Sequence, residues 1–260
     1  MQALTLTARH GWRWLAAGFA IFRKNPPLLT LFIISYWLLM ALLNTIPLLG
    51  AVAATLCIPA FSVSLMNACR NLDQGRPLVF PVLFSGFRSN LRVLLALGAI
   101  YFAATLGILA ASSIADGGIL FDMMLAGKPP SDEELHSGPF MAATQIALLL
   151  LLPLVMAYWY APVLAAWHAF PAPKALFFSF VACLRNWRAF LAYGLAVVLF
   201  SALLPGLLLG MLVSLFPASG NFLTALFTVP IFFVFMPTLF ASFYVSYRDV
   251  FVAPDATPDA

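Results

Sequence analysis

Charged residues are scarce in this sequence. Only 8% of the 260 residues are Asp, Glu, Lys or Arg, whereas 63% are hydrophobic; an ordinary soluble domain carries roughly 25% charged residues. A soluble fold of this length has too little interior to bury so many large apolar side chains. The composition therefore excludes a soluble protein and predicts that lipid surrounds much of the chain.

Residues that build catalytic and metal sites are also few. The three cysteines are too widely spaced for a disulfide framework or a zinc site. The three histidines are expected to be separated as well, with His136 on the opposite side of the membrane from His10 and His168. The chain contains no nucleotide-binding or catalytic motif. We therefore predict no cofactor, no metal ion and no enzymatic activity.

Six apolar segments are long enough to cross the hydrocarbon core, which takes about 20 helical residues. None has a charged residue in its interior, and the first is too long for a cleavable signal peptide, so we expect it to be retained. Because a helix satisfies its backbone hydrogen bonds within its own segment, we predict an all-α polytopic bundle. Residues 1–260 would form a single membrane domain, with 251–260 as a short polar C-terminal tail. The predicted spans are 27–48, 50–68, 91–113, 140–166, 189–215 and 221–246.

The basic residues lie on one side of these spans. Twelve of the thirteen Lys and Arg residues fall in the N-terminal segment, in the loops after the second and fourth spans, or after the sixth span. The opposite side has two short turns and a longer loop, 114–139, which holds five acidic residues and only Lys128. Because basic loops stay in the cytoplasm, we predict a bacterial inner-membrane protein with both termini cytoplasmic.

The segment 9–24 predicts an amphipathic helix rather than a loop. On a helical wheel, its bulky apolar side chains occupy one half and its four cations the other. Two placements remain open: a helix lying in the membrane interface, and a short helix packed on the cytoplasmic face of the bundle. The segments 79–90 and 174–187, before the third and fifth spans, are similar but less cleanly divided. The apolar half of 9–24 holds Trp12, Trp14, Leu15, Phe19, Ile21 and Phe22.

The three amphipathic segments end alike, which suggests an internal repeat. Their ends read FRKN (22–25), FRSN (87–90) and LRNW (184–187). We expect each Arg to reach the lipid phosphates and each Asn to cap the next helix. The second and sixth spans also share a Pro, a Ser and an Arg at the same spacing: Pro59, Ser64 and Arg70, then Pro237, Ser242 and Arg248. We predict three parallel repeats, 9–73, 79–170 and 174–250.

Three stretches, GWRWL (11–15), FRKNP (22–26) and YVSYRDVF (244–251), resemble a group of uncharacterised proteobacterial inner-membrane proteins. That group is similar in layout to the membrane domain attached to some glycerophosphoryl diester phosphodiesterases. The resemblance covers most of the chain and implies six spans and an inner-membrane location. It supplies no catalytic residues, and we expect no counterpart of the phosphodiesterase catalytic domain within 1–260.

The leading functional hypothesis is a non-enzymatic module that binds lipid or a membrane protein partner. The net charge of +4 forms no basic stripe, so we expect contact with anionic lipid head groups on the cytoplasmic side and no nucleic acid. The alternative is a transporter or channel-like protein for an apolar or amphiphilic solute, because prolines in the spans invite kinks that can surround a cavity. A water-lined cavity would favour this alternative, and a packed centre the binding module. The predicted head-group residues are Arg13, Arg23, Lys24, Arg88, Arg185 and Arg188.

The predicted topology can be tested with reporter fusions placed after Lys128 and after Arg248. Because these residues are expected on opposite sides of the membrane, a reporter that is active only in the cytoplasm should give opposite signals at the two positions. Equal signals would contradict the six-span arrangement.

Overall fold

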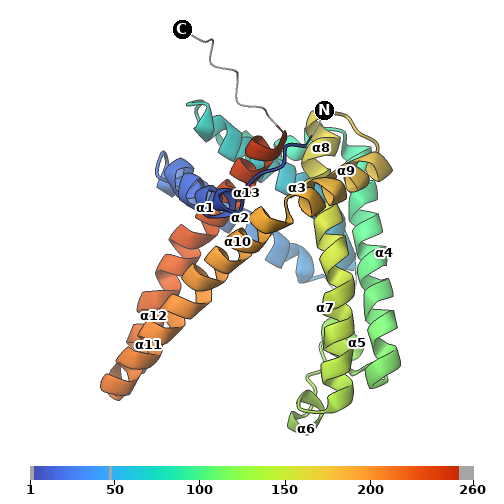
Figure 1. Ribbon diagram of the computed structural model, residues 1–260, viewed down its shortest axis with the longest axis vertical. Coiled ribbons are helices and arrows are strands. Elements are labelled where there is room, and N and C mark those ends of the chain that lie inside the picture. Colours follow the sequence, from blue (N-terminus) through green and yellow to red (C-terminus); the bar gives the residue numbers. More distant parts are fainter. Residues whose placement is uncertain (1–2, 47–48, 252–260) are drawn as a thin grey trace.

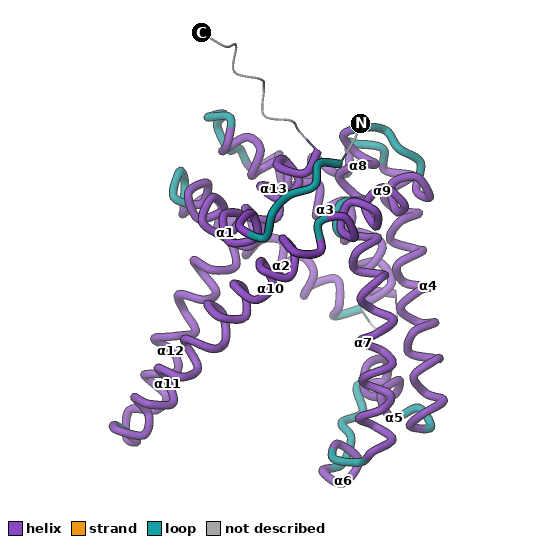
Figure 2. The backbone as a smooth tube through the Cα atoms, viewed as in Figure 1, coloured by secondary structure: helices purple, strands orange, loops and turns teal. Residues whose placement is uncertain are grey.

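The computed structural model describes residues 3–46 and 49–251, and within them every regular element is helical (Figure 2). This confirms the predicted all-α polytopic membrane bundle. Residues 252–260 of the predicted tail lie outside the described part. Within that part, six helical stretches are long and apolar enough to cross a membrane, and each agrees with a predicted span to within a few residues. They are Pro26–Asn44, Leu49–Asp73, Leu91–Asp116, Gly138–His168, Trp187–Leu215 and Pro217–Phe251.

The described spans pair into three hairpins. Two of them spread apart from the end of the molecule where α1 (Arg9–Phe22) and α9 (Ala172–Arg185) lie (Figure 1). This end is here called the basic end because it carries most of the Lys and Arg residues. The first hairpin is α2 (Pro26–Asn44) with α3 (Leu49–Asp73), and the second is α4 (Leu91–Asp116) with α7 (Gly138–Tyr158) and α8 (Ala161–Trp167). In the third, α10 (Trp187–Val198), η3 (Leu199–Leu203) and α11 (Leu204–Leu215) lead away from the basic end. The chain returns through α12 (Gly220–Pro230), η5 (Ile231–Phe235) and α13 (Met236–Phe251).

Short elements connect the far ends of the second and third hairpins. Between α4 and α7 lie α5 (Ile119–Phe121), the π-helical η2 (Asp122–Ala126) and α6 (Asp132–Leu135), which together form the predicted acidic loop. A single 3-10 turn, η4 (Pro217–Ser219), joins α11 to α12.

Three short helices at the basic end connect the hairpins to one another. They are α1 (Arg9–Phe22), the 3-10 helix η1 (Phe80–Arg88) and α9 (Ala172–Arg185). Each precedes one hairpin and packs on the returning span of another: η1 on α3, α9 on α7 and α8, and α1 on α13. The contact between α1 and α13 joins the first hairpin to the third and closes the circle. Three parallel repeats would produce this cyclic order, although the repeat itself stays a prediction.

Two of these crossings bring backbones together. A Cβ added at Gly86 of η1 would overlap the carbonyl oxygen of Ala60 on α3. A Cβ at Gly18 of α1 would lie 2.6 Å from the backbone nitrogen of Ser242 on α13. Only glycine allows so close an approach, so these two positions fix where η1 and α1 cross the spans.

At the third crossing, α9 supplies hydrogen bonds to a break in the fourth span. The chain leaves helical geometry between α7 and α8, just before Pro162, and the regular bond from the Tyr160 N–H to the Met156 carbonyl is missing. The Ser179 hydroxyl of α9 occupies this gap: it accepts from the Tyr160 N–H at 2.9 Å and donates to the Met156 carbonyl at 2.8 Å. One buried side chain thus satisfies two backbone groups that have no access to water.

Helix α1 packs on the bundle rather than lying free in the interface. Trp14, Leu15, Ile21 and Phe22 are buried, and α1 contacts both α10 and α13. The remainder of its apolar half, Trp12 and Phe19, is exposed, as expected for side chains that face lipid. Of the two placements left open by the sequence, the structure supports packing on the bundle.

The capping prediction is right for one asparagine and wrong for two. Asn25 accepts from the backbone N–H three residues ahead, at 3.3 Å, and begins α2. Asn90 instead donates to the carbonyl of Ala165, at the end of α8. Asn186 accepts from the N–H of Leu6 and donates to neighbouring carbonyls. Both amides bind segments that the fold brings close, because these segments hold backbone groups that need partners.

We predict that Ser179→Ala destabilises the protein more than an ordinary serine substitution. Loss of the hydroxyl leaves the Tyr160 N–H and the Met156 carbonyl unpaired, at a cost of about 1–3 kcal/mol for each buried group. Thermal unfolding in detergent should show a Tm several degrees lower. Ser214→Ala is the control, because this exposed serine only returns a bond to its own helix. Equal Tm values for the two variants would contradict the role of Ser179.

Candidate functional site

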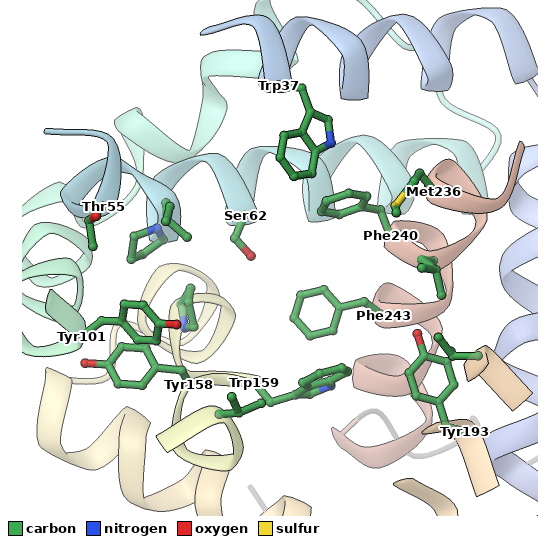
Figure 3. Close-up of a pocket in the computed structure, with 16 residues that line it drawn as sticks. Trp37, Thr55, Ser62, Tyr101, Tyr158, Trp159, Tyr193, Met236, Phe240 and Phe243 are labelled. Carbon is green, nitrogen blue, oxygen red and sulfur yellow. The ribbon is translucent and has the colours of Figure 1, made fainter. Parts of the chain in front are cut away.

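A cavity of about 540 Å³ lies where the three hairpins meet. Side chains from α2, α3, α4, the α7–α8 junction, α10 and α13 point into it (Figure 3). The described residues that line it are aromatic, aliphatic or hydroxyl-bearing, and none of them is charged. Ten of them are labelled in Figure 3: Trp37, Thr55, Ser62, Tyr101, Tyr158, Trp159, Tyr193, Met236, Phe240 and Phe243.

Three of the five hydroxyl-bearing residues that line this central cavity have hydrogen-bond partners within the protein. Thr55 donates to a carbonyl of its own helix at 2.8 Å. Tyr158 donates to the backbone carbonyl of Leu97 at 2.9 Å, and the Tyr193 hydroxyl lies 2.7 Å from that of Ser242. In the described part of the chain, the Ser62 and Tyr101 hydroxyls make no side-chain hydrogen bond, and the Trp159 indole N–H is buried without a partner. Because the lining is uncharged and mostly apolar, the cavity is suited to a hydrocarbon group with few polar atoms rather than to an ion.

Packed aromatic rings continue from the cavity toward the basic end. Trp159 meets Phe243 and Phe190 edge-on, with both ring centroids 5.4 Å away. Tyr160, fully buried, stacks on Phe243 and contacts Phe251 edge-on at 5.2 Å. Because Phe251 ends α13 at the basic end, these rings close this side of the cavity.

A charged cluster at the basic end holds α1, α3 and α13 together. Asp73, near the end of α3, accepts from the Arg248 guanidinium at 2.9 Å and lies 3.8 Å from the Lys24 ammonium. Asp249 pairs with Arg248 at 3.4 Å and accepts from the indole N–H of Trp14 at 3.1 Å. Two cations and two carboxylates balance, so the cluster adds no net charge. Sequence reasoning missed it, because its members lie far apart along the chain.

The predicted head-group residues fall into two groups. Lys24 donates to the backbone carbonyls of Leu72 and Asp73 and belongs to the charged cluster, so it has a structural role. The other five are exposed, and no carboxylate in the described part of the chain pairs with them: Arg13, Arg23, Arg88, Arg185 and Arg188. The guanidinium of Arg23 lies over the Phe19 ring and that of Arg188 over the Trp187 ring, both at 5.4 Å from the centroid. Arg185 also donates to the Thr5 hydroxyl.

Titratable groups outside the spans show ordinary structural roles. The backbone N–H and hydroxyl of Ser131 hydrogen-bond to Glu134 and hold the pKa of this carboxyl below its usual value; together they form a capping box for α6. Burial raises the pKa of the Cys183 thiol to about 12, so it stays protonated at neutral pH. In the described part of the chain, no three His, Cys, Asp or Glu side chains gather in a way that could hold a metal ion.

Comparison with known proteins places this architecture in a family. The chain is 38% identical, over 258 residues, to a protein of Burkholderia thailandensis that is described as a "probable inner membrane protein". The match covers 96% of this chain and 94% of the relative. The chain belongs to the same family. Together with the six apolar helices, this membership supports a multi-pass protein of the inner membrane. No family model matches the chain, and no solved structure matches it.

We predict that Asp73 and Arg248 are energetically coupled. Either substitution, Asp73→Asn or Arg248→Gln, removes the shortest ion pair of the cluster and leaves the other charge with only its longer pair, to Asp249 at 3.4 Å or to Lys24 at 3.8 Å. The second substitution should therefore cost less once the first is made. The coupling energy of the double-mutant cycle should be about 0.5–3 kcal/mol, measured by unfolding in detergent. The pair of Asp122 and Lys128 on the acidic loop is the control, since both side chains are about half exposed or more and such pairs couple weakly. Additive effects at Asp73 and Arg248 would contradict the prediction.

Proposed function

We propose that this family member is a non-enzymatic inner-membrane module that binds a membrane lipid, with a hydrocarbon chain of the lipid in the central cavity. The observation that carries the proposal is the uncharged lining of this cavity, which consists mostly of aromatic and aliphatic side chains. Its volume falls within the roughly 300–1,000 Å³ of typical small-molecule pockets. The centre is therefore neither water-lined nor solidly packed, which were the two outcomes that would separate a transporter from a binding module.

The bilayer sets the physical terms of this binding. Lipid tails are already in an apolar solvent, so the hydrophobic effect contributes little when a tail enters the cavity. Selectivity must come from contact with the rings of Tyr101, Trp159 and Phe243 and from the shape of the space between the hairpins. We expect the cavity to select the shape of a chain rather than to hold any lipid tightly.

In the proposed orientation, the basic end and both termini face the cytoplasm. Support comes from the distribution of basic residues, twelve of thirteen of which lie on that side of the spans. The five exposed arginines would there meet anionic head groups, with about 1 kcal/mol of attraction for each. Lys24 is left out of this set because Asp73 already neutralises it.

The likeness in layout to the membrane domain of some glycerophosphoryl diester phosphodiesterases stays a prediction from the sequence, and it would fit a non-enzymatic role. A membrane protein partner is also compatible with the proposal. Helices α11 and α12 of the third hairpin expose their apolar side chains almost throughout.

A transporter or channel-like protein for an apolar or amphiphilic solute is the second candidate. It is favoured by the π-helical segments η3 and η5, which interrupt both arms of the third hairpin next to Pro205 and Pro230. Such interruptions are common where a helix bends or serves a function. Movement of a fluorescent phospholipid between the leaflets of reconstituted vesicles would support this candidate over a static binding module.

We predict that Ser62→Phe, which fills the central cavity, reduces the lipid that stays bound after purification. Ser62 lines the cavity, and the added ring should occupy the space of a chain without removing a known hydrogen bond. Native mass spectrometry from a gentle detergent would count the retained lipids. Ser214→Phe is the matched control, because it places the same side chain on the exposed face of α11. An unchanged lipid complement in a correctly folded Ser62→Phe variant would contradict the proposal.

We further predict that the double variant Arg88→Gln, Arg185→Gln inserts normally but retains fewer anionic lipids. Glutamine keeps hydrogen-bonding capacity and removes the charge, while ten other basic residues on the same side still direct insertion. The pair Arg76→Gln, Arg92→Gln is the charge-matched control outside the predicted head-group set. Equal retention of anionic lipids in the two double variants would mean that Arg88 and Arg185 act only as topological signals.

A further inference from the structure

A second apolar cavity, of about 690 Å³, lies under α1 and between the two arms of the third hairpin. Trp12, Ala16 and Phe19 of α1 form its end toward the basic side, and Phe200 and Pro230 belong to the two arms. Its described lining includes no charged side chain and shares no residue with the central cavity. This cavity, here called the α1 groove, is therefore a separate site.

The α1 groove exists because α1 lies across both arms. At one end of the helix, a Cβ added at Gly11 would overlap the backbone of Ala189 on α10. Two turns farther along the helix, a Cβ added at Gly18 would lie 2.6 Å from the backbone nitrogen of Ser242 on α13. These contacts hold the arms apart at the basic end. Beyond α1, the π-helical segments η3 and η5 line the groove from opposite sides.

A cation stands at the basic end of this apolar groove. Phe19 lines the groove, and the guanidinium of Arg23 lies over its ring at 5.4 Å from the centroid. At about 100° per residue, Arg23 projects only about 40° from the direction of Phe19, whereas Arg13 projects about 120° from it. Arg23 is exposed, so its donors are open to a ligand. An apolar groove that ends at a guanidinium matches a phospholipid, which joins an acyl chain to a phosphate.

We propose that the α1 groove binds an anionic phospholipid from the leaflet at the basic end, with one acyl chain in the groove and the phosphate on Arg23. The net charge of the head group follows from the surroundings. Arg9, Arg13 and Arg23 all lie on or directly after α1, and the nearby carboxylates Asp73 and Asp249 are already paired with Arg248. A zwitterionic head group would bring its ammonium next to these arginines, whereas an anionic head group has no such penalty.

The test compares variants in nanodiscs of equal phosphatidylglycerol and phosphatidylethanolamine, followed by native mass spectrometry of the released protein. Arg23→Gln should lower the ratio of retained phosphatidylglycerol to phosphatidylethanolamine about fivefold, the equivalent of ~1 kcal/mol. Ala16→Phe should lower retained phosphatidylglycerol similarly by filling the groove, and Ala16→Leu is a smaller filling variant if the ring disturbs folding. Arg76→Gln is the control, with the same charge change at an exposed arginine that lies outside both the groove and the predicted head-group set, and should leave the ratio nearly unchanged.

Two results would overturn the site. Equal losses in Arg23→Gln and Arg76→Gln would mean that the basic end attracts head groups without a defined groove. Full retention in folded Ala16→Phe and Ala16→Leu variants would mean that no acyl chain occupies it. Ser62→Phe separates this inference from the proposed function, because it fills only the central cavity: loss of phosphatidylglycerol there, with none in the Ala16 variants, would support the central cavity alone.

Discussion

Lipid offers no hydrogen-bond partner to a peptide group, and the rest of this structure depends on that constraint. It explains why the spans are helical and why the backbone groups at each departure from regular helix are hydrogen-bonded in another way. The break between α7 and α8 is bridged by the Ser179 hydroxyl. Near Pro205 and Pro230 the chain forms π-helical turns, which keep a hydrogen-bond ladder with altered spacing.

The short helices at the basic end turn these spans into one molecule. Because α1, η1 and α9 each belong to one hairpin and pack on another, the three hairpins are joined at this end. Farther away, two hairpins diverge (Figure 1). One cavity lies where the three hairpins meet, and a second lies under α1 between the arms of the third hairpin. In a bilayer such space meets hydrocarbon on its open sides. The same architecture that stabilises the bundle therefore creates both the central cavity and the α1 groove.

The few charges of the chain divide into two sets by their partners. Lys24, Asp73, Arg248 and Asp249 neutralise one another and tie α1, α3 and α13 together. The exposed arginines lack such acidic partners and border apolar surface, where Phe19 and Trp187 carry two of the guanidinium groups. An arginine that rests on an aromatic ring keeps its donors directed outward. This division separates the basic residues that hold the fold from those available to lipid.

The sequence by itself determined the six spans, the helical class, the shared side of the basic residues and the amphipathic helix at 9–24. These features depend on composition and on local periodicity, which a single chain carries in full. It could not show that Trp14 is buried while Trp12 faces outward, because both are bulky and lie on the same half of α1. Contact with Phe190 on α10 decides between them.

Long-range contacts decided the remainder of the candidate site. Asp73 and Arg248 are 175 positions apart in the sequence, and no local pattern around either residue predicts that they pair. Asn90 and Asn186 do not cap the helices that follow them. They hydrogen-bond instead to segments that only the folded chain brings within reach. The two cavities depend on the angles at which helices cross, which close backbone contacts such as those at Gly11 and Gly18 set. Local patterns place a segment in the membrane, whereas the space between segments is a property of their packing.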